Sequence, residues 1–191
     1  YSKGEFKLGE NIKYARQDSA VFNGEYFSDR HPGNAFTLLG FEFITRPLTP
    51  FMKEIKLSAF GRETMDSSDN RLTASLLLLP ALAGTILFFL IYHSLVDFFS
   101  ISRPAAAAAA IGLCFGTIIL RYGTVIYSHM LCALLVSASH LLFVSYARTR
   151  RRAAIFGACL LLSYAVLCEH IALPLCLTAA IYLFIAARRD F

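Results

Sequence analysis

The run LTASLLLLPALAGTILFFLIYHSLVDFF, residues 72–99, determines the class of this protein. It contains one histidine, His93, and one acid, Asp97, both near its far end. An α-helix needs about 20 consecutive apolar residues to cross the hydrocarbon core of a bilayer, and this run is longer. We therefore expect a transmembrane helix here.

Further apolar segments follow this run, separated by short polar clusters. Pro104 suits the first turn of a helix, and Arg121-Tyr122-Gly123 is expected to break that helix. The stretch 153–187 is too long for one crossing, and it suits two short ones that meet at Glu169-His170. The predicted helices are 72–99, 104–120, 124–147, 153–168 and 171–187.

The composition agrees with an all-α integral membrane protein. Of the 191 residues, 57% are hydrophobic and 16% are charged, whereas about a quarter are charged in soluble domains. Residues 1–71 hold ten acids and ten bases, so the net charge of +5 comes from residues 72–191. The bases there form short clusters between apolar runs and cannot form the basic face of a nucleic-acid-binding protein.

The arginines predict an orientation, because Lys and Arg in short loops favour the cytoplasmic side. Arg103, the arginines at 148–152 and Arg188-Arg189 fall at alternate connections, while the other connections hold only Arg121. Residues 1–71 are then an external segment, and Arg121 and Glu169-His170 lie at the outer face. The external amino end and the start at Tyr1 lead us to expect a further transmembrane helix before residue 1.

The external segment contains no cysteine, and residues 51–60 are a candidate helix. Residues 51–60 alternate apolar and charged side chains, which fits a helix in the membrane interface or an ordinary solvated helix. The five cysteines lie in the apolar helices, at no metal-ligand spacing, and are interpreted as packing residues.

The stretch NGEYFSDRHPGNAF, residues 23–36, carries the clearest chemistry. It predicts a hairpin turn at Asn23-Gly24, a short aromatic strand, a turn closed by Pro32-Gly33 and a helix capped by Asn34. Asp29, Arg30 and His31 are consecutive and follow the aromatic Tyr26. An acid beside cations can activate an acceptor while the cations hold a phosphate leaving group; the alternative is a plain charged turn.

Three stretches together resemble a group of prokaryotic polytopic glycosyltransferases of the GT-C type. The run GEYFSDRHPG (24–33) resembles the signature G-x-Y-[YF]-S-[ND]-[KR]-x-P-G of their first external loop. The segment from Phe115-Gly116-Thr117 to Tyr127-Ser128-His129 resembles their G-T…[FY]-S-H segment, and CEHIALP (168–174) resembles their T-E-Y-P turn. Their relatives transfer mannose or aminoarabinose from dolichyl or undecaprenyl phosphate.

The resemblance implies a polyprenyl-phosphate sugar donor, an inner-membrane location and a catalytic acid in the external loop. The candidates for that acid are Asp18 and Asp29, with Glu10 behind them, unless the acid precedes Tyr1. Arg30 takes the place of the family's lysine and suits phosphate binding. His31 replaces a proline of the relatives. A divalent cation could take part, but no metal-ligand pattern requires one.

The predicted topology brings several polar residues to one depth at the outer face. They are Arg121, Tyr122, Thr124, Ser128, His129, Glu169 and His170. Ionisable groups at membrane depth are costly and are usually paired or functional. We expect Arg121 to pair with Glu169. We also expect Arg121, His129, Glu169 and His170, together with Tyr26 of the external segment, to help bind the substrate and its phosphate. The alternatives are a snorkelling Arg121, a merely polar hairpin tip at Glu169-His170 and a structural His129.

Two functions remain open from the sequence. The first is a membrane glycosyltransferase, or the amino-terminal part of one, that uses a polyprenyl-phosphate sugar at the non-cytoplasmic face. The second is a non-catalytic membrane subunit on a truncated GT-C scaffold that packs against other membrane subunits. The expected partners are membrane lipids and the lipid-linked sugar, and not nucleic acid.

Overall fold

The computed structural model describes residues 19–28, 32–45, 47, 70–123 and 128–188. The chain divides into two compact units, Tyr1–Pro32 and Gly33–Phe191. The boundary falls at the start of a helix, Pro32–Thr45, whose residues from Gly33 onward belong to the second unit. The division at residue 71 into an external loop and a membrane bundle stays a prediction. The predicted helix over residues 51–60 lies outside the described residues.

The first unit contains a β-hairpin. Strands β1 (Ser19–Phe22) and β2 (Glu25–Ser28) are antiparallel, with Ser19 opposite Ser28 and Phe22 opposite Glu25. Asn23 and Gly24 have φ values of 52° and 77°, and two positive φ angles in a two-residue loop match the right-handed twist of the strands. The predicted turn at Asn23-Gly24 is confirmed, and the hairpin is a departure from a purely α-helical fold.

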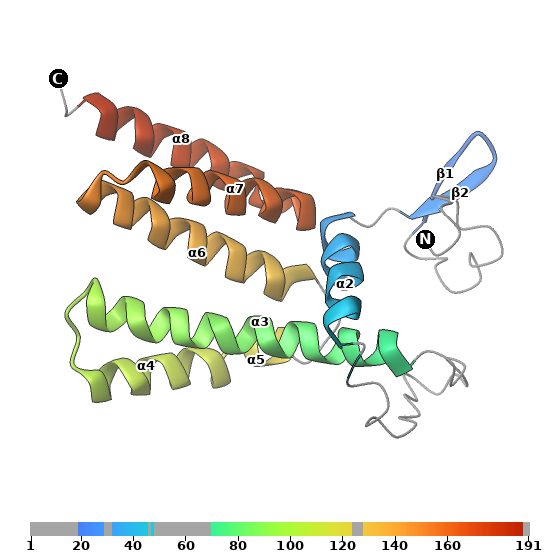
Figure 1. Ribbon diagram of the computed structural model, residues 1–191, viewed down its shortest axis with the longest axis horizontal. Coiled ribbons are helices and arrows are strands. Elements are labelled where there is room, and N and C mark those ends of the chain that lie inside the picture. Colours follow the sequence, from blue (N-terminus) through green and yellow to red (C-terminus); the bar gives the residue numbers. More distant parts are fainter. Residues whose placement is uncertain (1–18, 29–31, 46, 48–69, 124–127, 189–191) are drawn as a thin grey trace. The chain divides into compact units, whose positions relative to one another are not determined.

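The second unit is helical apart from short connections, over the residues that the structure describes (Figure 1). Its elements are α2 (Pro32–Thr45), α3 (Asn70–Asp97), α4 (Arg103–Phe115), α5 (Ile118–Gly123), α6 (Ser128–Thr149), α7 (Arg152–Cys168), η4 (His170–Ala172) and α8 (Leu173–Arg188). Helices α3, α6, α7 and α8 correspond to four of the predicted segments. Helix α2 begins at Pro32, in the favoured first-turn position, and not after Asn34 as predicted.

The stretch predicted as one helix, 104–120, forms two helices that are separated at Gly116-Thr117. Helix α4 ends at Phe115, and Gly116 ends it because glycine is a poor helix former. Thr117 then accepts a hydrogen bond at Oγ1 from the backbone N–H of Ile119 at 3.3 Å, which is a typical N-terminal cap. The new helix α5 runs through Arg121-Tyr122-Gly123, which was the expected break.

Helix α6 is the centre of the packing, because buried residues on it contact three neighbours. Met130 packs with Ala83 and Leu87 of α3. Leu131 and Cys132 pack against Ala165 and Cys168 of α7 and Ala172 of η4, and Phe143 packs against Ala158 and Leu162 of α7 beside α8. Ala158 and Ala165 are 0% exposed, so small residues allow α6 and α7 to approach closely.

Consecutive long helices run in opposite directions, which gives this unit two chemically different ends (Figure 1). We call the end formed by the α3–α4 and α6–α7 connections the arginine end, because Arg103, Arg148, Arg150, Arg151 and Arg152 lie there. Arg148 joins the two connections. Its guanidinium donates to the carbonyl oxygen of Phe98 at 3.2 Å, and its Cζ lies 4.7 Å from the centre of the Phe98 ring. We call the opposite end, with the α5–α6 and α7–α8 connections, the polar end.

Two helices are long and apolar enough to cross a membrane by length and composition, Leu78–Asp97 and Ser128–Thr149. Three shorter apolar helices accompany them: Arg103–Phe115, Arg152–Cys168 and His170–Tyr182.

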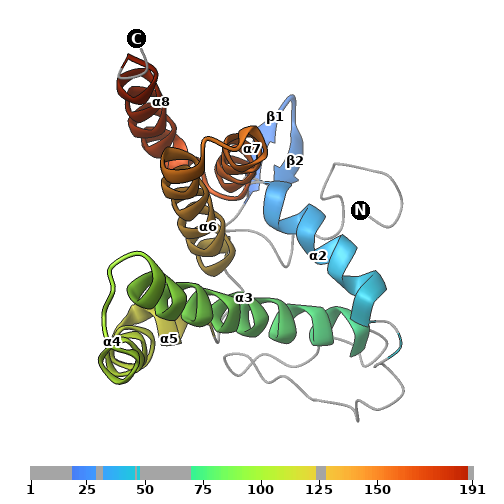
Figure 2. The same cartoon turned by 60° about the vertical axis from the view of Figure 1, so that its left-hand side comes forward.

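Helix α2 lies across the polar end and not along the bundle helices, as Figures 1 and 2 both show. Its first turn is fixed to α7. The hydroxyl of Tyr164 donates to the carbonyl oxygen of Gly33 at 3.0 Å and lies 2.8 Å from Thr37 Oγ1. A Cβ on residue 33 would come within 2.6 Å of the backbone of Leu167 and Cys168, so only glycine permits this approach.

Candidate functional site

Glu169 lies at the polar end, in the short connection between α7 and η4. Its φ and ψ of −153° and 114° are extended, so helix α7 ends at Cys168. The side chain is 13% exposed, which is low for a carboxylate outside a helix. A carboxylate that is largely removed from water needs partners, and α6 supplies them.

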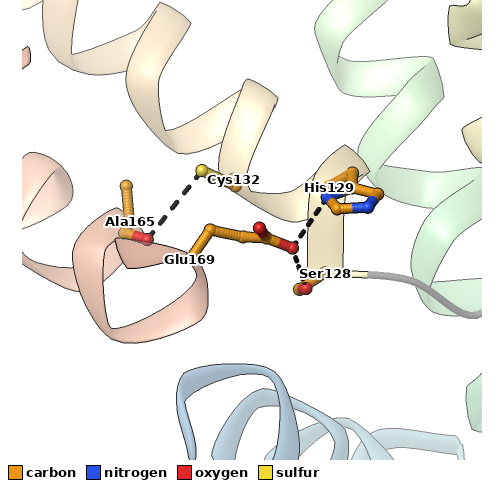
Figure 3. A network of polar contacts seen from close by, with 5 residues as sticks. All are labelled: Ser128, His129, Cys132, Ala165 and Glu169. Carbon is orange, nitrogen blue, oxygen red and sulfur yellow. Dashed lines mark hydrogen bonds and ion pairs between the residues drawn. The ribbon is translucent and has the colours of Figure 1, made fainter. Parts of the chain in front are cut away.

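Two consecutive residues at the start of α6 contact this carboxylate (Figure 3). The hydroxyl of Ser128 donates to Glu169 Oε1, and His129 Nδ1 lies 2.7 Å from the same oxygen. When Nδ1 carries the proton it donates to the carboxylate, which fixes the orientation of the imidazole ring. Glu169 is thus the positioning group for His129, whose side chain is 45% exposed.

The ring of Tyr122 extends this cluster towards α5. It packs edge to face against the imidazole of His129, with 4.8 Å between the ring centres. Arg121 precedes it in α5 and is exposed. The polar cluster, defined here as Tyr122, Ser128, His129 and Glu169, therefore draws on α5, α6 and the α7–η4 connection.

The cluster can do two things chemically. A histidine that is oriented by a carboxylate can bind an anion as a hydrogen-bond donor, or it can take up a proton through Nε2. Arg121 adds a permanent positive charge on the neighbouring helix. Such a set suits a phosphate group that approaches from the polar end.

The structure brings together part of the predicted polar layer. Ser128, His129 and Glu169 meet as expected: the hydroxyl of Ser128 donates to Glu169 Oε1, and His129 Nδ1 lies 2.7 Å from it. The pairing of Arg121 with Glu169 stays a prediction. His170 lies in η4 and is exposed. Thr124 lies outside the described residues.

The loop candidates have a different outcome. Asp18, Asp29, Arg30 and His31 lie outside the described residues, so their predicted roles stay predictions. The backbone of Tyr26 is in β2, opposite Val21. Within the described ranges, no group of three or more His, Cys, Asp or Glu side chains is placed to hold a metal ion.

Sequence reasoning missed the contact between α2 and α7 that borders this site. Gly33, Thr37 and Tyr164 form it, and Gly33 packs on Cys168, the residue before Glu169. Gly33 was assigned to a turn, and Tyr164 is one aromatic residue within an apolar helix, so neither carried a signal of its own. Only the resemblance, which places Gly33 in its first motif and Cys168 in its third, could have suggested that these two parts of the chain meet.

Comparisons with known proteins give no further assignment: no family model matches the chain, and neither the curated proteins nor the solved structures contain a match.

Proposed function

We propose that this chain is, or is part of, an integral membrane glycosyltransferase of the GT-C type that uses a polyprenyl-phosphate sugar at the non-cytoplasmic face. The observation that carries the proposal is that residues at the ends of the three stretches of the resemblance contact one another. Gly33 ends the first stretch, Ser128-His129 ends the second and Cys168-Glu169 begins the third. Gly33 contacts the backbone of Cys168, and His129 contacts Glu169.

The membrane placement is part of this proposal. In it, all five apolar segments cross the bilayer, α4 and α5 together forming one crossing. The two membrane-length helices and the gathering of arginines at one end support this placement. The arginine end then faces the cytoplasm, and the polar end faces outward with the loop that holds Asp18 and Asp29.

The proposed reaction is a single displacement with inversion at the sugar. The acceptor hydroxyl oxygen attacks the anomeric carbon, the bond from that carbon to the phosphate oxygen breaks, and polyprenyl phosphate leaves. Asp18 or Asp29 takes the acceptor's proton. Arg30, with Arg121, His31 and the oriented His129, binds the phosphate as its charge develops.

The test measures sugar transfer in membranes that contain the full-length protein, with a panel of radiolabelled polyprenyl-phosphate sugars. The variants are His129→Ala and Glu169→Gln. Loss of one donor to a developing charge costs about 100-fold or more in rate, so we expect that loss for His129→Ala. Glu169→Gln should lose about 10- to 150-fold, because a hydrogen bond to a charged group contributes about 1.5–3 kcal/mol and each 1.4 kcal/mol is a factor of ten in rate.

The chain offers a matched control in a second histidine–carboxylate pair. His93 Nδ1 lies 3.6 Å from Asp97 Oδ2, and both side chains are exposed near the arginine end. Asp97→Asn should therefore keep wild-type activity. Equal activity of His129→Ala, Glu169→Gln and wild type would overturn the site. A well-folded wild type that is inactive with every donor would overturn the enzyme and favour the membrane subunit.

A further inference from the structure

The connection between α6 and α7 is a short, ordered loop with a dense positive charge. Four of the five residues 148–152 are arginines. The backbone N–H of Arg150 donates to the carbonyl oxygen of Tyr146 at 2.8 Å, and the backbone N–H of Ala154 donates to the carbonyl oxygen of Arg151 at 3.0 Å. The backbone of the loop is therefore fixed at both ends, and so are the points from which the four guanidinium side chains extend.

Arg150 has a backbone conformation in which glycine is the common residue. It follows the last residue of α6 and has a φ of 54°, in the left-handed region. Glycine is frequent at this position after a helix because it has no Cβ and adopts a positive φ without steric cost. A side chain that is kept in a costly conformation points to a function for that side chain, and a guanidinium supplies a permanent charge and planar hydrogen-bond donors.

Aromatic rings orient two of the guanidinium groups. Arg148 Cζ lies 4.7 Å from the centre of the Phe98 ring, and the same guanidinium donates to the carbonyl oxygen of Phe98 at 3.2 Å. Arg150 Cζ lies 5.8 Å from the centre of the Tyr146 ring. Contact with the face of a ring holds a guanidinium in place without neutralising its charge. A guanidinium has five N–H donors, so Arg148 retains donors for a further group.

The charge of this loop suits an anionic ligand. In the part of the chain that the structure describes, no acid forms an ion pair with Arg148, Arg151 or Arg152. Asp97, at the end of α3, contacts His93. Guanidinium groups bind phosphate through short, charge-assisted hydrogen bonds that are often paired. A phosphate group is therefore the ligand chemistry that this loop fits.

An exposed apolar surface adjoins the arginines and favours a phosphate that carries acyl chains. Phe156 lies one turn after Arg152 on α7 and is 73% exposed, and Leu160 lies one turn further on and is 60% exposed. Residues four positions apart lie on the same side of a helix. In the proposed membrane placement, the loop lies at the cytoplasmic end of the membrane-length helix α6, at the level of the lipid headgroups. A lipid whose phosphate contacts Arg152 can then place an acyl chain along Phe156 and Leu160.

We propose that the α6–α7 loop binds the phosphate of an anionic phospholipid of the cytoplasmic leaflet. Arg152 is the main contact, with Arg151 and Arg148 beside it, and Phe156 contacts the acyl chain. The inference rests on the membrane placement in the proposed function and not on the transfer reaction proposed there. The bound lipid holds the loop, and with it the ends of α6 and α7, at the cytoplasmic surface.

Lipid binding to the purified full-length protein in a non-ionic detergent tests the proposal. Native mass spectrometry measures the affinity for phosphatidylglycerol, for phosphatidylcholine with the same acyl chains, and for glycerol 3-phosphate, which has no acyl chain. The variants are Arg152→Gln and the double variant Arg151→Gln/Arg152→Gln, and Arg151→Gln alone replaces them if they do not fold. Arg103→Gln is the matched control, because Arg103 is exposed and begins an apolar helix at the same end of the unit.

An arginine near an anionic membrane surface strengthens the attraction about fivefold. The wild type should bind phosphatidylglycerol more tightly than phosphatidylcholine, and this affinity should fall about fivefold in Arg152→Gln or Arg151→Gln and about 25-fold in the double variant. Arg103→Gln should bind phosphatidylglycerol as the wild type does.

Three results would overturn the proposal. Equal affinity for the two lipids would show that the loop does not select an anionic headgroup. An equal loss in Arg103→Gln and Arg152→Gln would show attraction to the net charge and not to this loop. Binding of glycerol 3-phosphate as tight as that of phosphatidylglycerol would show a site for a free phosphate. The measurement involves no sugar transfer, so a failure here is distinct from a failure of the proposed reaction.

Discussion

Gly33 shows how one residue can determine the position of a whole element. Its missing side chain lets the first turn of α2 contact the backbone at the end of α7, where a Cβ would come within 2.6 Å of Leu167 and Cys168. Backbone atoms in the last turn of a packed helix cannot move aside as a flexible side chain could. The tolerance of this position for a methyl group is therefore low.

We expect Gly33→Ala to destabilise the protein by about 1–3 kcal/mol, the usual cost of adding a group to a well-packed site. Gly40→Ala is the matched control on the same helix, because a Cβ there meets nothing within 4 Å. Alanine favours a helix over glycine by about 1 kcal/mol, so this variant should be as stable as wild type or more stable. Thermal unfolding in detergent compares them, and equal melting temperatures for both variants would contradict the close contact at residue 33.

The polar cluster shows which part of a site the sequence can predict. Helix length and rise placed His129 and Glu169 at one depth, and they are in contact. Their pairing could not be predicted in the same way, since it depends on which faces of α5, α6 and α7 turn towards one another. Ser128-His129 begins α6 directly opposite the end of α7, whereas Arg121 lies on the exposed side of α5.

At the scale of elements, the lengths of the apolar runs predicted the four helices α3, α6, α7 and α8 well. Residues that favour turns and caps predicted the remaining elements less well. The hairpin turn at Asn23-Gly24 was predictable because that pair favours two positive φ angles. The break between α4 and α5 was missed because Gly116 and Thr117 are both tolerated inside apolar helices. Their effect depends on the cap that the hydroxyl of Thr117 makes with Ile119 in the folded chain.

The contact between α6 and α7 should be the element interface most sensitive to side-chain size. Ala158 is 0% exposed, and its carbonyl oxygen accepts a hydrogen bond from Ser139 Oγ at 2.8 Å. Ala158→Leu forces these helices apart and should cost about 1–3 kcal/mol, or about 2–4 °C in melting temperature for each kcal/mol. Ala153→Leu, on the exposed side of α7, is the control and should leave the melting temperature unchanged. A stable Ala158→Leu variant would mean that these helices are not closely packed.

For the whole molecule, the structure shows where the positive charge of the helical unit lies, which the composition alone does not. The net charge of +5 resides in residues 72–191, and the described arginines there gather at one end, apart from Arg121. The contacts of Glu169 and the first turn of α2 lie at the other end. The chemistry proposed for the polar end and the orientation proposed from the arginine end therefore involve different residues, and each proposal can be tested without the other.

Orientation is tested by the accessibility of single cysteines in intact cells, in a background without the five native cysteines. Ile171→Cys lies in η4 at the polar end, at a position 76% exposed, and Arg150→Cys lies at the arginine end. Because arginine-rich connections stay on the cytoplasmic side, a membrane-impermeant maleimide should label Ile171→Cys from outside and Arg150→Cys only after the cells are opened. Labelling of Arg150→Cys alone in intact cells would invert the orientation. Labelling of both positions from outside would contradict the crossing of the membrane by α7, the helix between them.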